Sequence, residues 1–215
     1  MVSKTFASVA LIAAGLVAAQ CAQAVTVGFS TCPATGGGFT TCVAGATVID
    51  FNSGSLPGNY SGNGAVVTGS VSGKYAAPAG DTTAYLTVPT ASSNPATGSV
   101  TATLSGSYNY FGLYWGSMDA YNTLAFYNNG TLVASLDGDD VIAAGTALGN
   151  QTAPGSNRYV DLSFGTQYFN RVVLSSTNFA FESDNHAFAR VAEPGSLALL
   201  GLGLLGLGLA RRRAA

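Results

Sequence analysis

An Asn-Gly pair at positions 129 and 130 restricts the fold of this chain more than any other local pattern. It separates two runs rich in β-branched and aromatic residues, 121–127 and 131–136. Both central residues of a type I′ turn need positive φ angles, which Asn and Gly tolerate better than other residues. The pair therefore predicts a two-residue β-hairpin that joins two antiparallel strands.

The run before this hairpin, 108–115, predicts a strand that lies inside the protein. Nearly every position in it is aromatic or apolar. A strand that is apolar on both alternating faces is covered on both faces, so we expect a central strand. The alternation assigns the large side chains to two faces: Tyr108, Tyr110 and Tyr114 on one, and Phe111, Leu113 and Trp115 on the other.

Short β-type runs separated by turn residues continue through the rest of the region 25–191. Prolines at 78, 89 and 95 argue against a long helix in its first half. The pattern predicts one all-β domain, a jelly-roll-like antiparallel β-sandwich. The further expected strands are 47–51, 65–71, 84–88, 98–104, 159–164, 168–175, 178–182 and 185–191.

The charge of the region 25–191 excludes one class of partner. It contains four basic and nine acidic residues, a net charge of −5. Proteins that bind nucleic acid neutralise phosphates with clustered Lys and Arg, and no such cluster occurs in this region. We therefore expect no nucleic-acid partner.

The first 24 residues have the layout of a secretory signal peptide with an apolar helix. Lys4 precedes an apolar run over 9–19, and Ala22 and Ala24 flank Gln23 as a small-x-small cleavage site. This layout predicts export through the Sec translocon and a mature chain that begins near Val25. A lipoprotein anchored through Cys21 is the weaker alternative, because Gln20 precedes that cysteine where a small residue is expected.

The chain ends in a Pro/Gly break, an apolar block at 197–210 and a cluster formed by Arg211, Arg212 and Arg213. A helix over these 14 apolar residues spans roughly 21 Å, against roughly 30 Å for the hydrocarbon core of a bilayer. The block is therefore short for a permanent anchor. Since arginines favour the cytoplasmic side, we expect transient insertion in a membrane, with the domain outside.

This terminal layout resembles the PEP-CTERM sorting signal of exported bacterial surface proteins. The resemblance rests on Glu193, Pro194 and Gly195, followed by the apolar block and the arginines. The family pattern is Pro-Glu-Pro, and Ala192 stands here in place of the first proline. The resemblance implies that an exosortase in the inner membrane recognises and removes residues 192–215. It also implies delivery to the cell surface or to the extracellular matrix, where exopolysaccharide is a candidate partner.

Two segments of the domain, 110–123 and 179–185, resemble segments of exosortase-dependent surface proteins with a sandwich domain. This resemblance implies fold and location, and it brings no activity with it. The chain contains no Gly-x-Ser-x-Gly elbow and no His-Glu-x-x-His motif, and the only histidine, His186, is expected to be structural. We therefore expect a non-enzymatic protein. A secreted hydrolase with two carboxylates remains an alternative.

A carbohydrate-binding module is the other alternative function. Tyr110, Tyr114 and Trp115 could present flat faces to sugar rings. Aromatic residues at strand spacing are more often part of a hydrophobic core, because each buries a large area there. Both interpretations remain open at the level of sequence.

Cys32 and Cys42 are the two cysteines of the mature chain. In an oxidising compartment they predict a disulfide that closes a short Gly-rich loop. A zinc site is the alternative, and the sequence near them supplies no His or third Cys to complete its ligands.

No cofactor is certain from the sequence, and structural Ca²⁺ is the one for which ligands can be named. Asp137, Asp139 and Asp140 place three carboxylates within four residues, and Ca²⁺ prefers oxygen ligands. Their spacing is not that of an EF-hand, which favours a polar turn in which Asp-Gly supplies the geometry, with Ca²⁺ as the alternative. A second calcium site would pair Asp50 with Asp184 or with Glu182, if the two ends of the sandwich meet.

Overall fold

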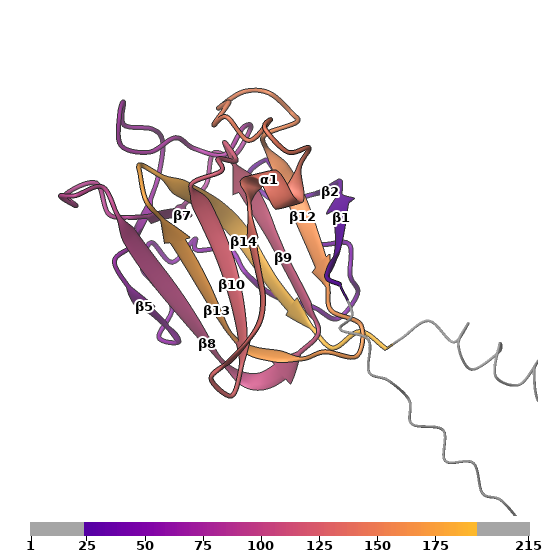
Figure 1. The fold of residues 1–215 in the computed structure, drawn as a ribbon. Helices are drawn as coiled ribbons and strands as arrows, with labels where there is room; N and C mark the ends of the chain where they lie inside the picture. Colours follow the sequence, from indigo (N-terminus) through magenta and orange to yellow (C-terminus); the bar gives the residue numbers. More distant parts are fainter. Residues whose placement is uncertain (1–23, 193–215) are drawn as a thin grey trace, which may run out of the picture.

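The computed structural model describes residues 24–192, which form two antiparallel β-sheets packed face to face (Figure 1). Every strand pairing is antiparallel, so the predicted all-β sandwich is confirmed. In spatial order, the first sheet contains β1 (Thr26–Ser30), β12 (Arg158–Ser163), β9 (Tyr110–Gly116), β14 (Phe181–Ala189), β7 (Tyr85–Val88) and β6 (Ala65–Val67), and β4 (Thr47–Ile49) also pairs with β14.

The second sheet contains β11 (Thr131–Asp137), β10 (Asn122–Asn128), β13 (Phe169–Ser176), β8 (Gly98–Tyr108) and β5 (Tyr60–Gly62), in that order. A two-stranded sheet of β2 (Cys32–Pro33) and β3 (Phe39–Thr40) pairs with neither of them and packs against the first sheet, where the Phe39 ring meets that of Tyr114. A single helical turn, α1 (Gly138–Val141), follows β11. The two helices expected in the terminal signals fall outside the described residues.

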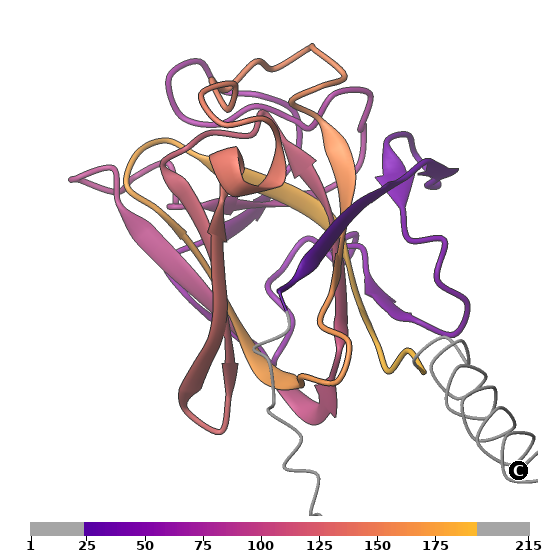
Figure 2. The ribbon, with the colours of Figure 1, turned by 45° about the vertical axis from the view of Figure 1, so that its right-hand side comes forward.

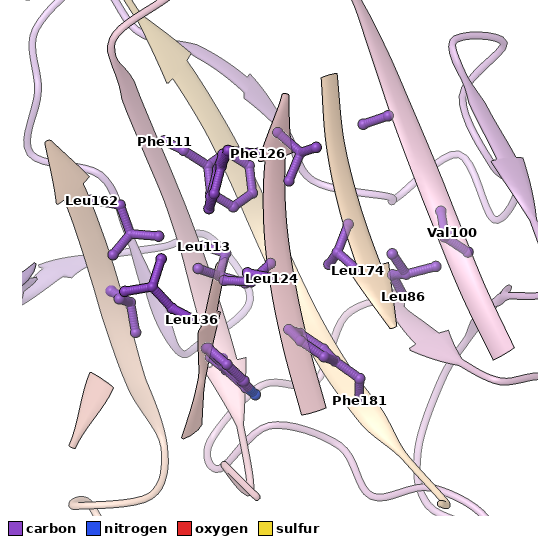
Figure 3. Packing of buried hydrophobic residues seen from close by; sticks show 14 of the residues in the cluster. Leu86, Val100, Phe111, Leu113, Leu124, Phe126, Leu136, Leu162, Leu174 and Phe181 are labelled. Atoms are coloured by element: carbon purple, nitrogen blue, oxygen red, sulfur yellow. The ribbon is translucent and has the colours of Figure 1, made fainter. Parts of the chain in front are cut away.

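The main hydrophobic core fills the space between the two sheets. Phe111 and Leu113 of β9 lie beside Phe126 and Leu124 of β10 (Figure 3), and all four side chains are fully buried. The rings of Phe111 and Phe126 meet edge to face with their centroids 5.5 Å apart. The core therefore depends on the alternation of these two strands, which places large apolar side chains on their facing sides.

Strand β9 is central and buried at every position, as predicted. Its odd-numbered side chains face the main core, whereas Tyr110 and Tyr114 face the opposite side of the sheet and pack with Tyr159. Tyr108 does not share this second face, which corrects the prediction. It ends β8 in the second sheet and packs against the main core, and the chain passes to the first sheet at Asn109, so the alternation of β9 does not extend to it.

Strand β14 replaces the two strands predicted at 178–182 and 185–191. Asn185 has a φ of 49° and forms a bulge, which shifts the pairing register with β9 between Asp184 and Ala187. One extra residue changes which side of the sheet the later side chains face. Glu182 and Asp184 therefore lie on the side away from the main core, and His186 lies within the core.

The predicted hairpin joins β10 and β11, with φ angles of 48° at Asn129 and 88° at Gly130. We expect Gly130→Ala to lower the free energy of unfolding by about 1 kcal/mol, because a Cβ atom disfavours positive φ. Gly155→Ala is the matched control, since Gly155 also has open space around it but no positive φ. Urea denaturation of both variants measures their free energies of unfolding. Equal losses of stability would show that the positive φ of Gly130 is not the cause.

The predicted disulfide joins Cys32 to Cys42, whose Cα atoms are 5.5 Å apart. The loop that it closes contains Gly37 and Gly38, which approach Gly80 and the ring of Tyr114 so closely that a Cβ atom would not fit. The disulfide therefore holds this loop against the outer side of the first sheet.

Removing the disulfide with Cys42→Ser is expected to destabilise the domain by about 3 kcal/mol, the chain-entropy value for a loop of this length. The sequence separation between the two cysteines is 10. Urea denaturation of the variant, and of the wild-type protein with and without reductant, measures the effect. The free energy of unfolding of the variant should equal that of the reduced wild type and should not change with reductant. A difference between these two values would show that the serine alters stability by more than the loss of the disulfide.

Candidate functional site

Buried polar groups gather on the outer face of the first sheet, the side turned away from the second sheet. Two long connections, residues 31–46 and 68–84, cover this face; Figure 2 shows the first of them on that side. Strand β14 contributes Glu182 and Asp184, which are 2% and 1% exposed. Each of these two carboxyl groups forms the centre of a separate polar cluster.

The first cluster lines a pocket of about 330 Å³. The walls come from the turn at 70–75, the segment after β9 and the loop at 149–151. Polar side chains dominate the lining, and they include both acidic and basic groups: Lys74, Ser117, Asp119, Tyr121, Gln151 and Glu182.

Glu182 is held at the bottom of this pocket by two hydrogen bonds. Its Oε1 accepts from the Ala76 backbone N–H at 2.8 Å, and its Oε2 accepts from the Ser117 hydroxyl at 2.9 Å. Burial raises the pKa of Glu182 to about 8, against the lowering effect of these two donors. The charge of Asp119 raises it further. Glu182 can therefore exchange a proton near neutral pH.

Asp119 is 8% exposed, and burial raises its pKa, although the neighbouring Tyr121 hydroxyl opposes this. The Tyr121 hydroxyl donates its proton to the Phe179 carbonyl oxygen at 2.9 Å. The Lys74 ammonium lies 4.1 Å from the centre of the Phe179 ring. The pocket thus combines two carboxyl groups, hydroxyls and a cation, a set that can bind a hydroxyl-rich ligand or exchange protons with it.

The second cluster contains Asp81 and Asp184. Asp81 Oδ1 accepts hydrogen bonds from the backbone N–H and the hydroxyl of Thr83, at 2.8 and 2.6 Å. The same hydroxyl lies 3.5 Å from Asp184 Oδ2. The remaining oxygens, Asp81 Oδ2 and Asp184 Oδ1, are buried without a hydrogen-bond partner. Burial raises the pKa of Asp184 to about 8, and Asp81 and Asp50 raise it further.

Asp50 accepts hydrogen bonds from the backbone and side-chain N–H groups of Asn52 and acts on Asp184 through its charge. The two ends of the sandwich thus meet as expected, with Asp184 rather than Glu182 near Asp50. Sequence reasoning missed the two remaining acidic members, Asp81 and Asp119. Both lie in connections, where no period of alternation indicates which way a side chain points.

The segment that contains Asp137, Asp139 and Asp140 caps a helix, which agrees with a polar turn rather than with a calcium loop. Asp137 Oδ1 accepts from the Asp140 N–H, and Asp140 Oδ2 accepts from the Asp137 N–H, both at 3.0 Å. Asp139 Oδ1 accepts from the Ala147 N–H at 3.1 Å. Because each carboxylate serves a backbone donor, the structure does not bring the three together as a metal site. Within residues 24–192, no three His, Cys, Asp or Glu side chains gather in that way.

The alternative interpretation of these aromatic residues as a sugar-binding surface is wrong, because all three side chains are buried, as expected for core residues. Tyr110 is 3% exposed, Tyr114 is 1% exposed and Trp115 is 0% exposed. Trp115 stacks on Phe181 within the core, with ring centroids 4.5 Å apart. The Tyr114 hydroxyl donates to the Ala79 carbonyl oxygen of the connection that covers the face. These residues stabilise the domain and cannot reach a ligand in solution.

Residues 191–213 match the family model of the PEP-CTERM protein-sorting motif. The chain therefore carries a sorting signal of the exosortase-dependent type at its C-terminal end, as predicted, which marks an exported protein directed to the cell envelope. No curated protein and no solved structure was found to match the chain.

The signal residues from Glu193 to Arg213, and Ala22 at the predicted signal-peptide cleavage site, lie outside the described residues. Between residues 24 and 192, no helix is long and apolar enough to cross a membrane.

Proposed function

We propose that this chain is a non-enzymatic protein of the bacterial cell surface or extracellular matrix, and that an exosortase removes its C-terminal signal after export. The position of the signal carries this proposal. Strand β14 ends at Ala189, and the motif begins at residue 191. Asn109 binds the Val191 backbone through two hydrogen bonds, of 2.7 and 2.8 Å. Removal of the signal beyond Val191 therefore leaves every described strand intact.

The N-terminal end supports the same route. Cleavage after Ala24 would leave all of β1, which begins at Thr26 and pairs with β12. The Cys32–Cys42 disulfide suits the oxidising compartment that an exported protein enters. Both expected processing sites thus flank the folded domain without cutting into it.

The test measures the intact mass of the protein by mass spectrometry in two strains of its bacterium. One strain has the exosortase, and the other lacks it. We expect the released form to lack Arg211–Arg213 in the first strain, and we expect an uncleaved, membrane-retained form in the second. The triple variant R211A/R212A/R213A should be processed less efficiently although its domain is unchanged. Extracellular protein that retains the arginine cluster would overturn the proposal.

The polar pocket supports a second candidate function, the binding of a carbohydrate. The Asp119 and Glu182 carboxyl groups and the Tyr121 hydroxyl can bond to sugar hydroxyls, and exopolysaccharide is the polymer that a matrix protein meets. Titration calorimetry against a polysaccharide panel tests this with wild type, Asp119→Asn and the distant control Leu132→Ala. Binding that is lost only in Asp119→Asn supports it. Release of reducing ends would instead support a hydrolase that uses the two carboxyl groups.

A further inference from the structure

The buried residues Asp81 and Asp184 bring two carboxyl groups together on the outer face of the first sheet, at 7% and 1% exposure. Burying a carboxylate is costly unless a cation, a proton or several donors compensate it. The nearby ionisable groups, Asp50, Tyr85 and Tyr114, are acidic and add no positive charge. The donors that act on the pair are the Asn185 backbone N–H and the Thr83 N–H and hydroxyl, and one oxygen on each aspartate is still buried without a hydrogen-bond partner.

The basic side chains of the described domain are engaged elsewhere. Lys74 and Arg158 lie over the rings of Phe179 and Phe29, at 4.1 and 4.4 Å. The other two, Arg171 and Arg190, lie over Tyr127 and Tyr168. These four are the only Lys and Arg residues between 24 and 192, so no basic side chain of the described domain compensates the Asp81–Asp184 pair.

We propose that Asp81 and Asp184 together bind one calcium ion, with Asp50 adding negative charge at the site. Ca²⁺ takes six to eight oxygen ligands, which include carboxylates, hydroxyls, backbone carbonyls and water. The two carboxylates offer the free oxygens, and the Thr83 hydroxyl lies between them. The site needs two acidic side chains and neutral oxygens, so it differs from the three-carboxylate loop that the sequence indicated.

Binding at this position would join three separate parts of the chain. Asp184 belongs to the central strand β14, Asp81 to the connection 68–84, and Asp50 to the segment after β4. A ligand held only by the folded state raises stability as its concentration rises above its Kd. Calcium would therefore stabilise the connection 68–84 in its position over the outer face of the first sheet. The inference is independent of the sorting signal, because its test does not depend on processing.

The experiment follows the melting temperature of the mature protein, first stripped with chelator and then titrated with CaCl2 or MgCl2. We expect calcium to raise the melting temperature by about 5–10 °C at 100 times its Kd, and magnesium to do much less. Asp184→Asn should remove the calcium response. Asp137→Asn is the matched control, because Asn also caps a helix, and it should keep the full response.

The competing arrangement is a proton shared between the two carboxyl groups. It predicts no calcium response in the wild type and a higher melting temperature for Asp184→Asn at pH 8, since an amide can donate to Asp81 permanently. Metal analysis of the wild-type protein after dialysis against CaCl2 decides the matter if Asp184→Asn fails to fold. One calcium per chain supports the site, and none overturns it.

Discussion

Replacing Trp115 with alanine is expected to lower the free energy of unfolding by about 3–5 kcal/mol, the range for deleting a large aromatic side chain from a core. Trp115 is fully buried between the sheets and stacks on Phe181 at 4.5 Å. The loss combines the transfer of the indole to water with the cavity that remains. Urea denaturation, followed by far-UV circular dichroism, measures it.

Trp115→Phe is the matched variant and should lose much less stability than Trp115→Ala. Phenylalanine preserves the stacking on Phe181, and it removes an indole N–H that is buried without a hydrogen-bond partner. Leu132→Ala, at a side chain that is 54% exposed, should change stability by about 0.5 kcal/mol or less. Equal losses for the two Trp115 variants would show that stacking area does not determine the effect.

Acid is expected to remove the stability that His186, the only histidine of the chain, contributes to the domain. The imidazole is fully buried; its Nδ1 lies 2.9 Å from the Tyr60 hydroxyl and its Nε2 lies 2.9 Å from the Ser183 hydroxyl. The rings of Phe51 and Phe111 pack against it. No charged group is among these contacts, so burial lowers the pKa of His186 from 6.5 to about 3.

The sign of the effect follows from proton binding. Below pH 6.5 the unfolded chain takes up a proton on His186 that the folded domain refuses, so acid favours unfolding. Stability from this residue is complete above pH 6.5 and is lost as the pH falls towards 3. The loss amounts to about 4 kcal/mol over that interval.

His186→Gln provides the comparison, because glutamine can bond to the same two hydroxyls without titrating. The variant should be less stable than the wild type at pH 7, and the difference should shrink as the pH falls. Denaturation curves at pH 7, 5 and 4 measure this difference. If the stability difference between wild type and variant does not change with pH, the imidazole of His186 is not kept neutral by burial.

The parts of the fold that could be predicted are those whose cause is local. The hairpin depends on the φ preferences of Asn129 and Gly130, and the central strand depends on apolar side chains at consecutive positions in 110–115. The disulfide depends on two cysteines ten residues apart in an exported chain. Each follows from neighbouring residues, so no knowledge of the rest of the chain was needed.

Sequence alone also determined where the chain is sent, since the sorting motif at 191–213 is a linear signal. Tertiary structure decided which side chains of the domain between the two signals are buried and which of them lie close together. The bulge at Asn185 turns Asp184 and His186 to opposite sides of one strand, and the covering connections bury Tyr110 and Tyr114. The same connections bring Asp81 to Asp184 across more than a hundred residues, because burial and charge depend on packing between distant segments rather than on order along the chain.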